Sequence, residues 1–321
     1  MEKIKSIIVG SLNTDIIAAG VSKLLGPGEL TFSGTARIGP GGKSRNIAQM
    51  IASYMGKGKV ALIGKTVEDP FNLWEVPYRS LQKAGVNTDF VTVENYQKTK
   101  KMPGIALIPV DRGGRNQIYV LPGINNDFRP RDLDACSSLF EVVARNNGFL
   151  GLTLELPMET AEHALSLADS YGIKTVLDPG GVEESADYRR ILNQNITFIK
   201  PNEHEAELLT GIKITGLKTA RTAAGKLFDY GIRNVLITHG PKGAYLITET
   251  IAEHIGLPEV PSEQIVDSTG CGDQVTATLI AELITKTDVA SACRVAVTAG
   301  TLQATRLGIQ PVKRKELQSY L

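Results

Sequence analysis

The sequence predicts an α/β fold in which helices flank a central, mostly parallel sheet and a small antiparallel sheet serves as a lid. Short apolar runs alternate with helix-like stretches of ten or more residues, the pattern of right-handed βαβ units. Most of these runs end in Gly, Asn, Asp or Pro, the residues of turns. Because ligands bind beyond the carboxyl ends of parallel strands, the polar residues after each run are the first candidates for a functional site.

The expected strands follow the chain in order. They are residues 7–9, 60–63, 150–156, 175–177, 197–199 and 235–238. The expected helices share a periodic apolar pattern and include IAQMIASYMG after residue 46, AEHALSLADSYG from residue 161, EHEAELLTG from residue 203 and QVTATLIAELITK from residue 274. Gly211 closes the third helix, as glycine often does at a helix C-terminus.

Two segments interrupt the alternation, residues 16–37 and 98–122. Both alternate apolar and polar residues between turn residues, which predicts a few antiparallel strands. They could simply extend the main sheet, but two similar segments far apart in sequence favour a separate lid. We see no linker, so we predict one domain over residues 1–321 with the lid inserted into it.

Composition excludes several classes of function. The chain has 321 residues, 42% of them hydrophobic, and a net charge of +1 with a pI of about 7.7. This balance gives no reason to expect nucleic acid or a membrane surface as partner, and no apolar run approaches the length of a membrane span. Three scattered cysteines fit neither a disulfide framework nor a zinc site, which indicates a cytoplasmic protein.

The stretch GPGGKSRN at residues 39–46 resembles a phosphate-binding loop but lacks its spacing. A P-loop requires G-x-x-x-x-G-K-[ST], and the position five residues before Gly42 is Arg37. Gly64-Lys65-Thr66 fails in the same way, because the corresponding position is Lys59. The glycines of this stretch therefore have another purpose.

The strongest local signal is DSTGCGD at residues 267–273, directly before a predicted helix. Glycines at a helix N-terminus leave backbone N–H groups open to an anion, and the helix dipole adds to the attraction. Asp273 lies in the first turn of that helix. It could be an N-cap, or a general base beside an anion hole, as phosphoryl transfer requires.

Other polar residues follow the predicted strands. Asn13 and Asp15 could bind a ligand rich in hydroxyl groups or simply form a turn. Glu155 interrupts an apolar strand, where a lone carboxylate is costly unless it meets a polar partner. Lys43 and Asn46 could donate hydrogen bonds to a sugar or a phosphate, although a loop lysine is more often solvated.

The segment NEHE at residues 202–205 opens a predicted helix. Asn202 and Glu203 could serve only as capping residues there. Glu205 lies one turn further along the same helix.

Together these motifs resemble the ribokinase-like (PfkB) sugar kinases, in the expected order from Ile7 to Pro311. The family's Gly-Gly motif with a downstream Asn appears as GGKSRN at residues 41–46, and its D-T-x-G-A-G-D signature as DSTGCGD. An N-x-x-E motif appears at residues 202–205 and a T-x-G-x-x-G turn at residues 238–243. The positions that hold the sugar match those of the ribokinases.

The resemblance implies a role for each matching residue. Asp273 is the implied catalytic base, and Gly270, Cys271 and Gly272 form the implied anion hole. The implied sugar ligands are Asn13, Asp15, Gly42, Lys43, Asn46 and Glu155. The implied nucleotide residues are Asn202, Glu205, Thr238, Gly240 and Gly243, with Asn202 and Glu205 near the phosphates and Mg²⁺. Asp267 and Thr269 would adjoin a monovalent cation, K⁺, and the lid would form a homodimer.

Three departures from the family pattern matter. Ser44-Arg45 replaces the usual Gly-Ala of the sugar loop. Arg45 could point inward to an extra carboxylate or phosphate of the substrate, but we expect it to point outward from the helix. Cys271 replaces the common alanine, which the anion hole should tolerate. Val312 replaces a serine and removes a hydroxyl ligand of the cation, which argues against K⁺ activation.

The leading hypothesis is an ATP- and Mg²⁺-dependent kinase acting on the primary hydroxyl of a pentose, with D-ribose as first candidate. The alternatives within the family are a nucleoside, fructose or a keto-deoxy sugar acid as substrate. A catalytically silent sugar or nucleotide sensor is the alternative from another class, but it would not need to keep DSTGCGD. A dinucleotide-dependent dehydrogenase is disfavoured because GSLNTD after the first strand lacks G-x-G-x-x-G.

Overall fold

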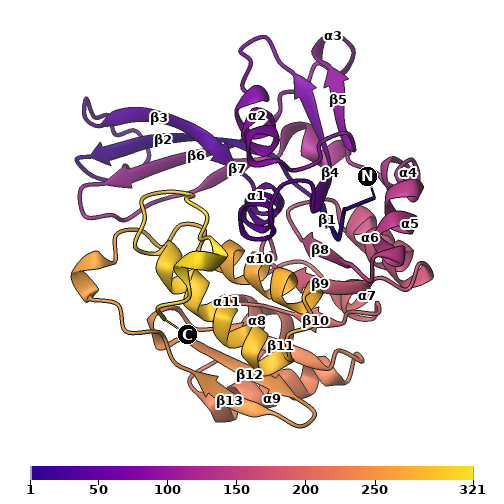
Figure 1. Ribbon diagram of the computed structural model, residues 1–321. Coiled ribbons are helices and arrows are strands. Elements are labelled where there is room, and N and C mark those ends of the chain that lie inside the picture. The colour runs from indigo at the N-terminus through magenta and orange to yellow at the C-terminus, as the bar shows by residue number, and fades with distance from the viewer. Residues whose placement is uncertain (1, 321) are drawn as a thin grey trace.

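A nine-stranded sheet forms the body of the computed structural model, which describes residues 2–320 (Figure 1). Its strand order is β13-β12-β11-β10-β9-β8-β1-β4-β5, parallel from β11 to β5, with β12 and β13 antiparallel at one edge. The strands are β1 (Ser6–Val9), β4 (Val60–Glu68), β5 (Val91–Asn95), β8 (Phe149–Thr153), β9 (Lys174–Asp178), β10 (Phe198–Ile199), β11 (Asn234–Thr238), β12 (Ala244–Thr248) and β13 (Ala252–Ile255). The predicted mostly parallel sheet is confirmed.

Helices cover both faces of this sheet. One face carries α4 (Pro130–Asp134), α5 (Ser137–Arg145), α6 (Met158–Ser170), α7 (Arg189–Leu192), α8 (Glu203–Thr210) and α9 (Leu217–Phe228). The other face carries α1 (Lys43–Met55), α2 (Glu75–Ala84), α10 (Cys271–Ile284) and α11 (Val289–Gln303). The short helix α3 (Tyr96–Thr99) follows β5, and 3-10 turns occur at Gly123–Asp127, Gly240–Lys242, Ser262–Gln264 and Arg314–Glu316.

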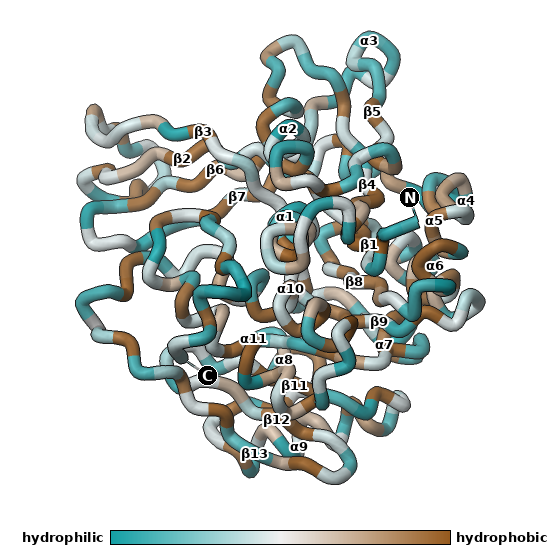
Figure 2. The backbone as a smooth tube through the Cα atoms, in the orientation of Figure 1, coloured by the Kyte–Doolittle hydropathy of each residue, from teal (hydrophilic) through white to brown (hydrophobic). Residues whose placement is uncertain are grey.

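Strand β1 shows why its sequence pattern gives this layered arrangement. Its four residues, SIIV, are all buried. Ile7 and Val9 pack into the core on the side of α4–α9, whereas Ile8 packs into the core on the side of α1 and α10. A strand buried on both faces is a continuous apolar run, as parallel sheets require. Figure 2 shows such hydrophobic stretches among the strands of the body.

A second sheet of four strands extends from the body, with the order β3-β2-β6-β7 (Figure 1). We call it the small sheet: β2 (Asn13–Val21), β3 (Thr35–Gly41), β6 (Gly104–Asp111) and β7 (Tyr119–Leu121). Its strands lie largely within the two predicted segments. The predicted antiparallel pairing is confirmed for β2 with β3 and for β6 with β7, whereas the central strands β2 and β6 pair in parallel. Strand β2 is the first strand of the antiparallel pair β2–β3, and β6 is the first strand of the antiparallel pair β6–β7. Both first strands leave the body in the same direction, so they are parallel to each other.

No helix within residues 2–320 is both long enough and apolar enough to span a bilayer.

Candidate active site

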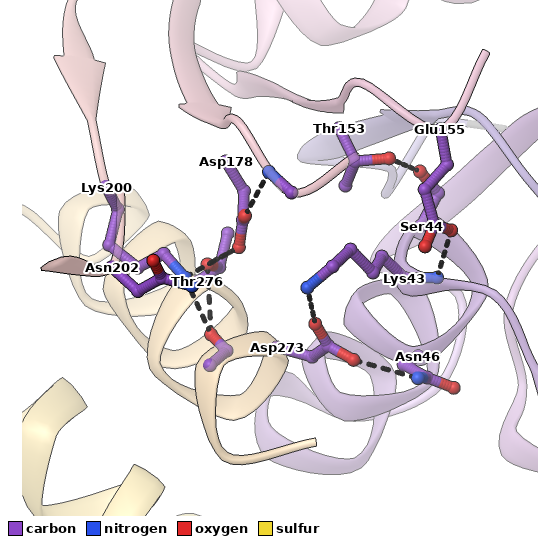
Figure 3. Close-up of polar contacts among 12 residues, drawn as sticks. Lys43, Ser44, Asn46, Thr153, Glu155, Asp178, Lys200, Asn202, Asp273 and Thr276 are labelled. Atoms are coloured by element: carbon purple, nitrogen blue, oxygen red, sulfur yellow. Dashed lines mark hydrogen bonds and ion pairs between the residues drawn. The ribbon is translucent and has the colours of Figure 1, made fainter. Parts of the chain in front are cut away.

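The site lies where the carboxyl ends of the central strands meet the N-termini of α1 and α10. Its polar side chains come from the start of β2, from the ends of β8–β11 and the residues that follow them, and from helices α1, α8 and α10. Figure 3 shows part of this set. This is the edge at which ligands bind in parallel α/β sheets. The same edge brings GGKSRN and DSTGCGD together, although more than two hundred residues separate them in the chain.

Asp273 points away from its own helix and toward α1. Helix α10 begins at Cys271 after Gly270, whose φ of 75° is left-handed, and no side chain caps it. Asp273 is buried, with 5% of the residue exposed. Its Oδ1 lies 3.4 Å from Lys43 Nζ, and its Oδ2 accepts a 2.8 Å hydrogen bond from Asn46 Nδ2 (Figure 3). The N-cap interpretation of Asp273 is therefore wrong, and its carboxylate faces the space between the two helices.

The glycines at the start of α1 allow close packing against β2. Gly42 has a φ of 91°, and a Cβ there would lie 2.9 Å from the Ser11 carbonyl oxygen and 3.1 Å from the Asn13 nitrogen. A Cβ on Gly41 would overlap the Asp15 carboxylate. Only glycine fits at such approaches. These contacts explain the glycine-rich stretch without a phosphate.

Glu155 stabilises the N-terminus of α1. Its Oε2 accepts hydrogen bonds from Ser11 Oγ at 2.6 Å and from the Lys43 backbone N–H at 2.9 Å. Strand β8 ends at Thr153, so Glu155 lies beyond the strand and does not interrupt it as predicted. The chain leaves the sheet there, and the N–H of Leu154 bonds to the carbonyl oxygen of Gly180. Burial raises the pKa of Glu155, while the Lys43 ammonium opposes that rise.

Arg45 does not point outward, contrary to expectation. It is fully buried. Its guanidinium donates to Asn46 Oδ1 at 2.8 Å, to Ser80 Oγ at 2.7 and 3.2 Å, and to the carbonyl oxygen of Pro40 and Oε1 of Gln49. Acceptors on α2 and at the end of β3 thus compensate for its burial. Burial lowers the pKa of Arg45 to about 10, opposed by the charges of Asp15 and Asp273. All five N–H groups of the guanidinium are occupied within the protein.

The end of the small sheet nearest the body carries two further predicted residues. Asn13 is buried, and its Oδ1 accepts a 2.8 Å hydrogen bond from Asn125 Nδ2. Burial raises the pKa of Asp15 to about 6. The Arg45 charge opposes this shift, whereas Glu155 and Asp273 add to it.

A buried ion pair that the sequence analysis did not assign lies beside Asp273. Asp178 is the last residue of β9, and Lys200 directly follows β10. Their Oδ2 and Nζ atoms are 2.8 Å apart, and both side chains have almost no exposed surface. Thr276 Oγ1 donates to the same Asp178 oxygen at 2.6 Å, and Lys200 Nζ lies 3.4 Å from the carbonyl oxygen of Gly272. The signal that could have found the pair is its position, because DPG and KPN each follow a predicted strand.

A cavity of about 500 Å³ opens beside this ion pair. All five predicted nucleotide residues line it: Asn202, Glu205, Thr238, Gly240 and Gly243. The turn of residues 270–273 and the side chains of Lys43 and Lys200 line the same cavity, together with apolar residues that include Leu257 and Ile265. Lys43 and Asp273 therefore stand between this cavity and the side chains of Asn13, Asp15 and Glu155.

Asn202 and Glu205 also cap α8, as the capping interpretation expects of Asn202. Asn202 Oδ1 accepts from the Glu205 N–H at 2.8 Å, and Glu205 Oε2 accepts from the Asn202 N–H at 2.9 Å. Burial raises the pKa of Glu205, and the nearby Asp178 adds to the rise.

Across residues 2–320, no group of three or more His, Cys, Asp and Glu side chains is arranged to hold a metal ion.

The fold and the comparison with known families define the class of protein, a carbohydrate kinase. The model of the pfkB family carbohydrate kinases matches residues 3–315, so the chain belongs to this family. The predicted resemblance is confirmed.

Relatives and solved structures agree with this assignment. The chain is 28% identical to a deoxyribokinase of Salmonella typhimurium over 94% of this chain and 93% of the relative. It is 30% identical to a ribokinase of Staphylococcus aureus over 87% of this chain and 86% of the relative. The structure is similar to that of Arabidopsis thaliana ribokinase complexed with ribose and ATP, with a TM-score of 0.85, 25% identity and coverage of 99% and 98% of the two chains.

Proposed function

We propose that this carbohydrate kinase transfers the γ-phosphate of ATP to the primary hydroxyl of a pentose, with D-ribose as first candidate. The observation that carries the proposal is the position of the Asp273 carboxylate. It lies between a nucleotide-sized cavity on one side and a cluster of hydroxyl-binding groups, Asn13, Asp15 and Glu155, on the other. The names of the ribokinase and deoxyribokinase relatives support a pentose.

In the proposed reaction, Asp273 accepts the proton of the sugar hydroxyl. The hydroxyl oxygen forms a bond to the γ-phosphorus while the bond from that phosphorus to the bridging oxygen of ADP breaks. Lys43 Nζ lies 3.4 Å from Oδ1 and places a positive charge beside the proposed base. The 2.8 Å hydrogen bond from Asn46 holds Oδ2, so one oxygen is oriented while the other faces the site.

The turn of residues 270–272 is the proposed anion hole. N–H groups in the first turn of α10 have no intrahelical acceptor, and the positive end of the helix dipole is directed at the cavity. The N–H of Cys271 already donates to the Ser268 carbonyl oxygen at 3.2 Å, so the N–H groups that follow it in the first turn are the proposed donors. Fixed donors of this kind stabilise charge that develops on the transferred phosphoryl group.

Residues that line the cavity also fit Mg²⁺, which would neutralise phosphate charge when bound. Glu205 lines the cavity and is largely buried. Its Oε2 accepts one hydrogen bond, from the Asn202 N–H. A single carboxylate of this kind is typical of proteins that bind Mg²⁺ together with substrate phosphates. Asn202 and Glu205 would therefore hold the metal and its waters.

The charges of the sugar side favour a neutral sugar over a sugar acid. Asp15, Glu155 and Asp273 supply three carboxyl groups. The Arg45 guanidinium is fully engaged within the protein, and Lys43 is paired with Asp273. A substrate carboxylate would therefore meet repulsion, and neither Arg45 nor Lys43 is free to bind it. Carboxylates are instead good acceptors for sugar hydroxyl groups.

The proposal is tested by measuring ADP release with ribose, deoxyribose, fructose, nucleosides and sugar acids. We expect release to be fastest with a pentose. Asp273→Asn should lower kcat by about 10²- to 10⁴-fold, the usual contribution of a general base, while nucleotide affinity changes little. Asp229→Asn, an exposed carboxylate at the end of α9, is the matched control. Strong release only with nucleosides, or near-normal turnover by the Asp273 variant, would contradict the proposal.

We also infer a homodimer formed through the small sheet, in the cytoplasm. Large apolar side chains are exposed on this sheet and its loops, among them Phe32 (95% exposed), Leu30, Ile38, Ile118 and Tyr119. Apolar surface of this extent favours association with a second copy of the chain. The three free cysteines, Cys136, Cys271 and Cys293, support a reducing compartment.

A further inference from the structure

The side chain of Gln303 connects the two loops that border the proposed anion hole. Gln303 is the last residue of α11 and is fully buried. Its Nε2 donates to the carbonyl oxygen of Gly308 at 2.7 Å and to that of Thr269 at 3.3 Å. Thr269 belongs to the turn that precedes α10, and Gly308 belongs to the loop after α11. One amide group thus joins both loops.

Other hydrogen bonds connect the same two loops. Asp267 Oδ2 accepts from the Gly308 N–H at 2.8 Å, and Asp267 Oδ1 accepts from the Thr269 N–H at 2.9 Å. The carbonyl oxygen of Ala304 accepts from the N–H groups of Val266 and Asp267. Both oxygens of the Asp267 carboxylate are therefore bonded to backbone N–H groups, which stabilise its negative charge.

A positively charged side chain of the protein holds the next carbonyl groups of the loop. Arg306 Nη1 donates to the carbonyl oxygens of Gln310 and Pro311, each at 2.9 Å. Its Nη2 lies 2.6 Å from Glu316 Oε1. The adjacent Val312 is buried, and its N–H donates to Gln274 Oε1 on α10 at 2.9 Å. The loop is thus fixed to α10 by donors and acceptors of the chain.

This donor set does not fit the monovalent cation that the family resemblance implies beside Asp267 and Thr269. Such a cation needs several oxygen atoms that converge with free lone pairs. Here an N–H₂ group is directed at the Thr269 and Gly308 oxygens, and an N–H₂ group repels a cation. Val312 offers no hydroxyl group. The oxygen atoms that a cation would need already accept hydrogen bonds from donors of the protein.

We propose that Gln303 replaces a monovalent cation in this kinase, so that the turn before α10 is held in place without K⁺. Gln303 is then a positioning residue, because it acts on the anion hole through Thr269 and touches neither substrate. The consequence for activity rests on the function proposed above, whereas the consequence for stability does not.

The orientation of the amide is the point on which the proposal depends. Carbonyl oxygens only accept hydrogen bonds, so Nε2 must face Thr269 and Gly308 if no cation is present. Gln303 Oε1 is buried and has no hydrogen-bond partner among the described residues. The reversed amide would bring three oxygens together, and that arrangement is stable only around a cation. The wild-type response to K⁺ therefore distinguishes the two orientations.

The test compares K⁺ with tetramethylammonium at equal ionic strength, using the melting temperature and the kcat for sugar phosphorylation. For the wild type we expect neither quantity to depend on the cation, since a site that binds no ion gains no stability from it. Gln303→Glu keeps the shape of the side chain but sets a carboxylate against two carbonyl oxygens. This variant should melt at a lower temperature in tetramethylammonium and recover in K⁺.

Gln310→Glu is the matched control, because Gln310 lies exposed in the same loop and donates only to the Leu307 carbonyl oxygen. It should behave like the wild type in both salts. In Gln303→Glu, kcat should fall by about 10- to 100-fold without K⁺, as expected when a catalytic turn is displaced, and should rise when K⁺ is added.

A higher melting temperature or kcat of the wild type in K⁺ would overturn the proposal. So would a Gln303→Glu variant that is unaffected and indifferent to K⁺. If no sugar is phosphorylated in any salt, the proposed function fails, and the melting temperatures still decide the role of Gln303. If Gln303→Glu does not fold in either salt, the wild-type comparison and the smaller change Gln303→Ala decide it.

Discussion

Replacing Lys200 by Met should destabilise the protein in a way that reports directly on the buried ion pair. The variant leaves the Asp178 carboxylate fully buried, with Thr276 Oγ1 as its nearest remaining donor. Removing one partner of a buried ion pair typically costs about 3–5 kcal/mol, because the other charge stays uncompensated. Since Lys43 also acts on Asp178, we expect a loss near the lower end, about 3 kcal/mol.

The pKa of Asp178 gives a second measure of the same interaction. Burial alone would raise the pKa of Asp178. The charges of Lys200 and Lys43 outweigh burial and lower this pKa from 3.8 to about 2. A difference of this size corresponds to about 2 kcal/mol of stability at neutral pH. Because the folded pKa is the lower one, this stability is present above about pH 4 and is lost as the pH falls toward 2.

In the Lys200→Met variant, the pKa of Asp178 should shift upward instead of downward. Without Lys200, burial outweighs the remaining charges, and the pKa of Asp178 should rise above its ordinary value. The penalty for a buried carboxylate is then largest at neutral pH and shrinks as the acid becomes protonated. The difference in unfolding free energy between wild type and variant should therefore narrow between about pH 7 and pH 4.

The assay is urea unfolding followed by circular dichroism at both pH values, with linear extrapolation to water. Lys101→Met is the control, because Lys101 forms a 2.6 Å ion pair with Asp127 at an exposed position. Exposed pairs contribute about 0–1 kcal/mol, so this control should lose little. A loss below about 1 kcal/mol for Lys200→Met, or a difference that does not narrow at low pH, would refute the reasoning.

Three further predictions follow from the site and the small sheet. Burial raises the pKa of Asp15 to about 6, so protonation below that pH should weaken sugar binding and lower kcat/KM. Asp15→Asn should remove this pH dependence. Arg45→Ala should lower the unfolding free energy by about 2–4 kcal/mol and also reduce kcat, because Asn46 loses the hydrogen bond that orients its amide. A loss of unfolding free energy below about 1 kcal/mol in urea would contradict this. Phe32→Ser should yield a monomer in light scattering, provided that the wild type is a dimer, and a monomeric wild type would exclude the proposed interface.

The sequence was sufficient to predict the layered fold because its strands are buried on both faces. Runs such as Ile7–Val9 are apolar throughout, and the turn residues after them mark the edge where the site forms. The pairing inside the small sheet was harder to predict. Alternating residues identify the strands β2 and β6, but their parallel pairing depends on how both leave the body.

The errors in the site concern charged residues whose partners come from distant parts of the chain. A helical arginine is usually exposed, and nothing near Arg45 in sequence indicates that Ser80 on α2 will accept its hydrogen bonds. Asp178 and Lys200 were each visible after a strand, but only the adjacency of β9 and β10 makes them a pair. Local patterns thus located the candidate site, whereas tertiary packing decided which charges face each other.

Strand β2 belongs to the small sheet and also carries two of the proposed sugar ligands. Asn13 and Asp15 lie on β2, and Gly41, against which the Asp15 carboxylate packs, ends β3. Residues 13 and 41 face each other in the first pair of this ladder. Bending of the small sheet at its base therefore displaces these two proposed ligands, because they belong to the same continuous backbone. We accordingly expect substitutions at the distant tip of this sheet to alter sugar affinity without touching the sugar.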